Sequence, residues 1–257
     1  MVLEKIINVS MIEDKPAYAI VLGIIFSTIG LVVGWLIFPN DASIVAIMFT
    51  AIASLPFIRK VIYIEEKGEE RAHTLKQLII RNKKIIEIFS LFFIGVAISY
   101  LLWYTVLPEL ARNTLFLKQT AVFSNQGAVL GQFVNRQTQF LNIFSHNLKI
   151  LLFCIVLSLL YGSGAIVILV WNASVLGVFI FHLGKLEKII RLIPYASLEF
   201  IAFFLAAIAG GILSVGIERH RTSSKLFKNI LFDSIFLFCL AIIILTISAV
   251  LEVHLLL

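Results

Sequence analysis

Seven apolar segments, separated by stretches that hold almost all of the charge, constrain the fold of this chain most. A helix needs about 20 apolar residues to cross about 30 Å of hydrocarbon. The segments run from 17 to 38, 42 to 58, 85 to 107, 150 to 161, 165 to 182, 194 to 217 and 230 to 251. Of 21 Lys and Arg and 15 Asp and Glu residues, the segments contain three, Glu87, Glu199 and Asp233. This segregation predicts an all-α, polytopic transmembrane helical bundle of seven spans.

The composition excludes the common soluble classes. Hydrophobic residues make up 60% of the chain and charged residues 14%, against about 45–50% and about 25% in soluble domains. An ordinary soluble enzyme or a nucleic-acid-binding domain is therefore excluded, and the lipid bilayer is the first expected partner. Cys154 and Cys239 lie in apolar runs and carry no metal-ligand or disulfide pattern. We expect a chain that is not an enzyme and that has no cofactor and no metal.

The first segment has two interpretations, a cleaved signal peptide or a retained transmembrane helix. It is 22 residues long, whereas the apolar region of a signal peptide usually has about 7–15 residues. No convincing small-x-small cleavage site follows it. We expect a retained helix.

The Lys and Arg residues predict the orientation of the chain in the membrane. If seven spans alternate, the N-terminus and the connections at 59–84 and 218–229 share one side, with 14 Lys and Arg residues against seven on the other side. Basic residues are enriched in cytoplasmic loops. The distribution predicts a multi-pass cell-membrane protein with its N-terminus in the cytoplasm and its C-terminus outside.

The fourth segment is short for a span. Its 12 residues cover only about 18 Å as a helix, so it either begins earlier, near Phe144, or enters without crossing fully. We favour two helices joined tightly at Gly162 and Gly164 over a pair of half-helices or a re-entrant element.

Two long connections separate the spans. The connection at 59–84 carries closely spaced opposite charges around Gly68, which indicates a solvated linker or helical hairpin, or a docking surface for a cytoplasmic partner. The connection at 108–149 shows an amphipathic pattern. The pattern predicts an interfacial helix leading into the fourth span, or a lid or wall of an outward-facing vestibule. Its apolar positions are Leu130, Phe133, Val134, Phe140, Leu141 and Phe144.

The run HNLKILLFCIVLSLLYGSGAIVILVWNASVLGVF, residues 146–179, resembles the stage II sporulation protein M family of membrane proteins. In that family an asparagine opens a span, a glycine turn follows, and a second asparagine precedes a glycine. The matching positions are Asn147, Gly162, Gly164, Asn172 and Gly177. The family then has Pro-His-Gly-x-x-Glu, of which this chain keeps Pro194 and Glu199 but has Tyr195 and Ala196 in place of histidine and glycine.

The resemblance covers residues 85–257 and implies a domain division. Residues 1–58 would be an N-terminal transmembrane hairpin, residues 59–84 a charged cytoplasmic linker, and residues 85–257 a five-span membrane domain. In sporulating bacteria the named member anchors a peptidoglycan-remodelling complex, so the resemblance implies a scaffolding role.

Glu199 is the most informative single residue, because an ionisable group inside a span is costly and marks a functional hypothesis. Ala206 and Gly210 follow at helical spacing, and Ala207 and Gly211 repeat the small-xxx-small pattern, which lets helices approach closely. We interpret Glu199 as an acceptor that locks neighbouring helices, with Asn172 or Tyr195 as donors. An ion or proton path and an outer interfacial position are the alternatives.

Four further positions complete the candidate set. Asn172 lies in the middle of the fifth segment. It is expected either to hold neighbouring helices together by a hydrogen bond or to form part of a polar path with Glu199. Gly177 permits close packing beside it. Asp233 is expected near the cytoplasmic start of the seventh helix, where the helix dipole stabilises it. Pro194 is expected at a helix start.

Two functions compete. The first is a non-catalytic membrane scaffold or assembly subunit with a membrane or cytoplasmic protein partner, which predicts partners that co-purify and no transport. The second is an ion channel or transporter with a polar path near Asn172 and Glu199, which predicts flux that is sensitive to Glu199→Gln. In either case we expect a homo-oligomer.

Overall fold

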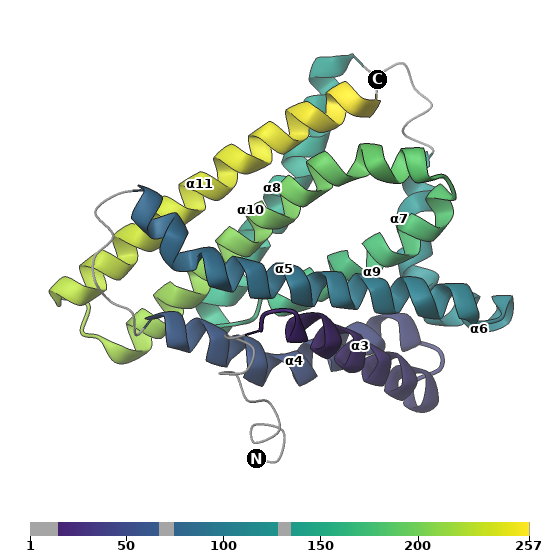
Figure 1. The fold of residues 1–257 in the computed structure, drawn as a ribbon, viewed down its shortest axis with the longest axis horizontal. Helices are drawn as coiled ribbons and strands as arrows, with labels where there is room; N and C mark the ends of the chain where they lie inside the picture. The colour runs from purple at the N-terminus through teal and green to yellow at the C-terminus, as the bar shows by residue number, and fades with distance from the viewer. Residues whose placement is uncertain (1–14, 67–74, 128–134, 257) are drawn as a thin grey trace.

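A computed structural model of the chain describes residues 15–66, 75–127 and 135–256. Within these ranges the secondary structure is helical, without strands (Figure 1). The helices are α3 (Tyr18–Ile37), α4 (Ala42–Glu66), α5 (Leu75–Val106), α6 (Glu109–Leu115), α7 (Leu117–Gly127), α8 (Arg136–Tyr161), α9 (Ile166–Leu183), α10 (Leu186–Arg219) and α11 (Lys225–Leu256).

Seven of these helices are long and apolar enough to cross a membrane: α3, α4, α5, α8, α9, α10 and α11. Large apolar side chains such as Ile25, Phe153 and Ile243 are exposed on their outer faces, as expected where lipid replaces water. The predicted class, a polytopic helical bundle with seven spans, is confirmed. The chain is a multi-pass membrane protein.

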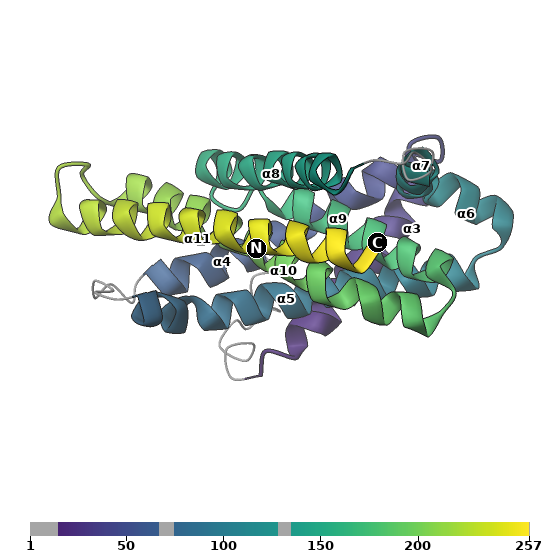
Figure 2. The ribbon, with the colours of Figure 1, turned by 90° about the horizontal axis from the view of Figure 1, so that it is seen from above.

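The spans pack in two groups. Helices α3, α4, α5 and α9 form one group, and α8, α10 and α11 form the other. The second group runs diagonally across the first in Figure 1, and the view in Figure 2 shows α8 along one edge of the bundle and α11 across its middle. Helix α10 contacts helices of both groups and therefore joins them.

Glycines set the closest helix contacts of the first group. A Cβ atom added to Gly95 in α5 would overlap the carbonyl oxygen of Ile20 in α3, and one added to Gly23 would overlap that of Phe92. Gly30 and Gly34 lie in the same way against Ala46 of α4. Small residues allow this backbone approach, which lets van der Waals contact hold helices together in lipid.

Several helices are longer than the apolar segments that predicted them. The fourth helix begins at Arg136, so its 26 residues span about 39 Å, and of the two alternatives for the fourth span the earlier start is confirmed. The described amphipathic positions, Phe140, Leu141 and Phe144, lie within α8 rather than in a separate interfacial helix. Asn135 caps α8 by accepting a hydrogen bond from the Gln137 backbone N–H at 3.4 Å. Polar residues in the N-terminal turns of α8 lower the hydropathy without breaking the helix.

Pro194 lies inside α10 and not at its start, because α10 begins at Leu186. A proline within a helix removes one backbone hydrogen bond and clashes with the carbonyl one turn earlier, which bends the helix. The ribbon of α10 is visibly curved in Figure 1. The expected hairpin around Gly68 and the amphipathic positions Leu130, Phe133 and Val134 lie outside the described residues.

We expect Gly95→Ala to destabilise the bundle by about 1–3 kcal/mol, because the added methyl group meets the α3 backbone. Ile94→Ala is the control, since Ile94 is exposed on the same helix. The measurement is the free energy of unfolding in mixed detergent micelles. Equal stability of Gly95→Ala and wild type would contradict the close α3–α5 contact.

Candidate functional site

A hydrogen-bonded cluster of polar side chains joins α8, α10 and α11. Asn147 of α8 donates from Nδ2 to Oε1 of Glu199 in α10 at 2.5 Å. Both side chains are partly buried. Glu199 therefore accepts a bond from a neighbouring helix, as predicted, but the donor is Asn147 and not Asn172 or Tyr195.

A second carboxyl group completes the cluster. Glu252, near the C-terminal end of α11, lies beside Glu199, so that the two carboxyl groups interact. A carboxylate can only accept hydrogen bonds, so a hydrogen bond between these two groups requires a proton on at least one of them. Side chains tilt toward the N-terminus of their helix. Since α10 and α11 run antiparallel, Glu199 and Glu252 lean toward each other.

A hydrogen bond between Tyr195 and Ser248 also joins α10 and α11, one helical turn from Glu199 and Glu252. The hydroxyl of Ser248 in α11 donates to the Tyr195 backbone carbonyl at 2.8 Å. Ser248 is fully buried, and Tyr195 lies close to both carboxyl groups. The site thus holds two carboxyl groups, one amide and two hydroxyl groups on three helices.

The register of α8 and α10 explains why Asn147 meets Glu199. The two helices run parallel, and the Cβ position of Gly210 in α10 lies 2.9 Å from Cβ of Ser158 in α8. Asn147 precedes Ser158 by 11 residues, and Glu199 precedes Gly210 by the same number. Eleven residues are about three helical turns, or about 16 Å. Close packing at Gly210 therefore brings the two polar residues together on facing sides.

Asn172 is not part of this cluster. Its Nδ2 donates to the backbone carbonyl of Ile168 in the same helix, α9, at 2.8 Å. The amide is therefore satisfied within one helix. The structure does not bring Asn172 and Glu199 into hydrogen-bonding contact.

The predicted turn glycines, Gly162 and Gly164, lie in the connection between α8 and α9. Gly162 ends α8 with φ 70°, a backbone conformation that favours glycine, and α9 starts at Ile166. The expectation of two helices joined at the glycine pair is confirmed. The turn is buried against α10, because a Cβ on Gly211 would lie 2.7 Å from the Gly162 carbonyl oxygen. Gly164 lies in the same turn, against the carbonyl oxygen of Leu157.

Two other packing residues lie at helix contacts. Gly177 of α9 faces α5, where a Cβ would lie 3.0 Å from Cβ of Tyr100. Ala206 of α10 is fully buried. Both positions are small where neighbouring helices pack.

The expected helix-dipole explanation for Asp233 is wrong. Helix α11 begins at Lys225, so Asp233 lies in its third turn, whereas the dipole acts mainly within the first turn. Glu87 is likewise deep in α5, which begins at Leu75. Asp233 is buried near the start of α11, and Glu252 lies near its other end. The two acidic residues of α11 are therefore far apart.

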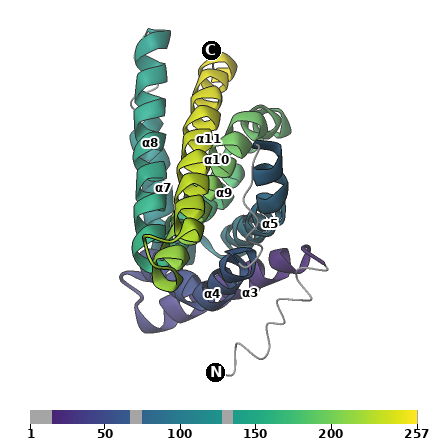
Figure 3. The same cartoon turned by 90° about the vertical axis from the view of Figure 1, so that its left-hand side faces the viewer.

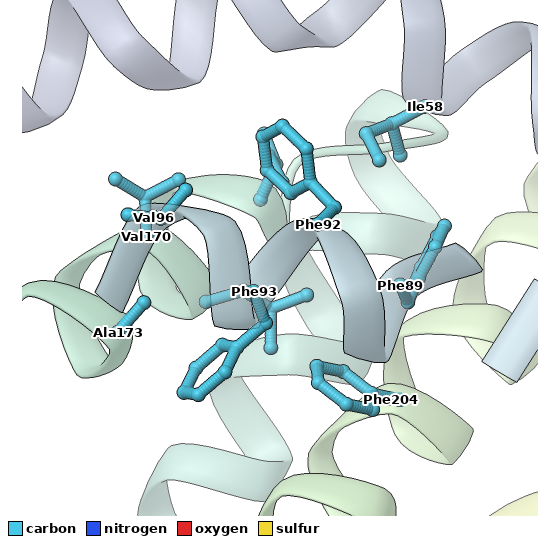
Figure 4. A pocket seen from close by; sticks show the side chains of 10 residues that line it. Ile58, Phe89, Phe92, Phe93, Val96, Val170, Ala173 and Phe204 are labelled. Atoms are coloured by element: carbon cyan, nitrogen blue, oxygen red, sulfur yellow. The ribbon is translucent and has the colours of Figure 1, made fainter. Parts of the chain in front are cut away.

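Aromatic side chains fill the junction between the two groups of helices. A small cavity of about 10 Å³, the space of about one water molecule, lies among α4, α5, α9 and α10 and has an entirely apolar lining (Figure 4). Phe89, Phe92, Phe93 and Phe204 line it. The rings of Phe93 and Phe204 meet edge to face at 5.7 Å. This junction is packed by apolar contacts.

Sequence reasoning missed Glu252, because the apolar segment ends at 251 while α11 continues to Leu256. The alignment of α10 with α11 in their antiparallel hairpin indicates the position of Glu252. Gly216 packs on Ile230 and Tyr195 meets Ser248, so an antiparallel hairpin turning near residue 222 places Glu199 close to the last turns of α11.

We expect Asn147→Ala to lower the free energy of unfolding by about 0.6–1.7 kcal/mol, the range measured for interhelical hydrogen bonds in membranes. Asn142→Ala is the control, because Asn142 is an exposed asparagine on the same helix. Unfolding in mixed micelles measures both variants. An equal effect of the two substitutions would contradict a structural role for the Asn147–Glu199 bond.

The chain was compared with known protein families, curated proteins and solved structures. Neither the curated proteins nor the solved structures contained a match to this chain. A sequence profile described as Stage II sporulation protein M matches residues 88–255. The matched region includes Asn147, Glu199 and Glu252, and so the whole polar cluster. It spans well over half of the chain, and the protein belongs to the stage II sporulation protein M family.

Proposed function

We propose that this protein is a non-catalytic membrane scaffold, an assembly subunit that holds membrane or cytoplasmic protein partners and acts as a homo-oligomer. The observation that carries the proposal is the cluster of Asn147, Glu199 and Glu252. Its polar groups bond to one another across three helices, which is how polar residues stabilise helix association in lipid. The anchoring role of the family's named member supports the same function.

The connection between α5 and α8 supports a docking role on the predicted outer side. Gln119 of α7 is fully buried. Its Oε1 accepts a bond from the Ser43 hydroxyl of α4 at 2.6 Å, and its Nε2 donates to the Ser174 hydroxyl of α9 at 3.3 Å. These bonds hold α7 in a fixed position on the bundle. A rigid surface loses little entropy on binding, which favours a partner.

Purification from native membranes tests the scaffold. We expect partner proteins to co-purify in mild detergent and to cross-link to the 63–81 or the 107–135 connection, because these are the long segments between the spans. Purification of the full chain without any stoichiometric partner, from a membrane in which it is expressed at its natural level, would contradict the proposal.

The second candidate function is that of an ion channel or transporter that has a polar path near Glu199 and Asn172. The observation that favours it is the Glu199–Glu252 pair, since two neighbouring carboxyl groups inside a membrane have the chemistry of a proton relay. Because Asn172 bonds within its own helix, Glu252 is the better partner for Glu199 in such a path.

A liposome experiment distinguishes the two functions. For the scaffold we expect no flux of monovalent cations, divalent cations, anions or protons above that of empty liposomes. Glu199→Gln removes the ionisable group, and Glu87→Gln is the control, because Glu87 is an exposed glutamate of α5. Flux that is abolished by Glu199→Gln and retained by Glu87→Gln, with equal folding and insertion, would overturn the scaffold in favour of transport.

A further inference from the structure

One end of the bundle presents exposed basic side chains from three helices, α4, α5 and α11, and from the turn between α10 and α11. The C-terminal end of α4, the N-terminal part of α5 and the turn between α10 and α11 lie at the end that faces the viewer in Figure 3. An ion pair between Arg59 and Glu218, at 3.2 Å, joins α4 to α10 there. We call this surface the basic end. Its exposed basic residues are Arg59, Lys60, Lys83, Lys84, Arg221, Lys225 and Lys228.

The positive charge of the basic end exceeds its acidic charge. Where the side chains are described, the exposed acidic residues on these elements are Glu87 and Glu218. Glu218 is engaged by Arg59. The cluster therefore keeps a net positive charge, which favours an anionic partner.

Exposed apolar side chains continue directly from the basic residues of α11. Leu231 and Phe232 follow Lys228 by three and four residues, so they lie on the same face of the helix. Their side chains are 36% and 58% exposed, and that of Ile235 one turn further is 54% exposed. A face with lysines at its end and an apolar stripe beyond them matches a lipid, whose headgroup is charged and whose chains are apolar.

We propose that Arg221, Lys225 and Lys228 of the basic end bind the phosphate headgroup of an anionic phospholipid, with its acyl chains along Leu231 and Phe232. The ammonium groups supply point charges for the phosphate, and lysines near a membrane surface each contribute about 1 kcal/mol of attraction to anionic lipid. Lipid binding at this site does not depend on the scaffold function.

The opposite end offers a matched control. Lys185 and Lys188 are exposed at the start of α10, with an exposed apolar neighbour in Leu186. There the Glu187 carboxylate accepts a bond from Arg191 at 2.6 Å, which neutralises that arginine. A double Lys→Gln variant at this end removes the same charge as one at the basic end.

The test is lipid binding to the full chain, measured by native mass spectrometry with phosphatidylglycerol and with phosphatidylcholine. We expect the wild type to bind phosphatidylglycerol more tightly. Lys225→Gln/Lys228→Gln should weaken that binding by about 10–30-fold, at about fivefold for each lysine. Lys185→Gln/Lys188→Gln should change it by less than twofold, and Lys225→Arg/Lys228→Arg, which keeps the charge, should retain it.

Three results would overturn the proposal. The first is no preference of the wild type for phosphatidylglycerol. The second is equal weakening by the two double Lys→Gln variants. The third is full displacement of the lipid by an equal concentration of inorganic phosphate, which would identify a site for a free anion. Melting temperatures of all variants show that each is folded.

Discussion

The close approach of α8 to α10 at Gly210 determines the arrangement of the C-terminal half. The Cβ position of Gly210 lies 2.5 Å from the carbonyl oxygen of Ile155, so any side chain there would push the helices apart. Lipid offers helices no hydrophobic driving force toward each other, and packing of small residues takes its place. With the two backbones in contact and parallel, the equal spacing along both helices brings Asn147 to Glu199.

The other contacts follow from the position of α10. Helix α11 returns antiparallel along it, so Ser248 reaches the Tyr195 carbonyl and Glu252 reaches Glu199. On its other side, α10 meets α5 through aromatic rings, with the centroids of Phe93 and Phe200 4.1 Å apart. Helix α10 thus bonds to its own group through polar side chains and packs aromatic rings against the other group, to which the Arg59–Glu218 ion pair also joins it.

The sequence predicts the helical class and the spans, because apolar segments of membrane length have few alternatives. It also predicts the turn at Gly162 and a hydrogen bond from a neighbouring helix to Glu199. The helix ends are less predictable, since α8 and α11 continue through polar residues that a hydropathy pattern excludes. For that reason Glu252 was missed, and Pro194 was expected at a helix start. The pairing of Asn147 with Glu199 depends on which helices are neighbours, and the pattern of one helix contains no such information.

The measurement that tests the account most directly is a double-mutant cycle between Asn147→Ala and Glu199→Ala, read as free energies of unfolding in mixed micelles. If the two side chains are bonded as described, the double variant should lose less stability than the two single variants together, with a coupling energy of about 0.6–1.7 kcal/mol. Additive effects, within about 0.3–0.5 kcal/mol, would contradict the contact between α8 and α10 on which the candidate site rests.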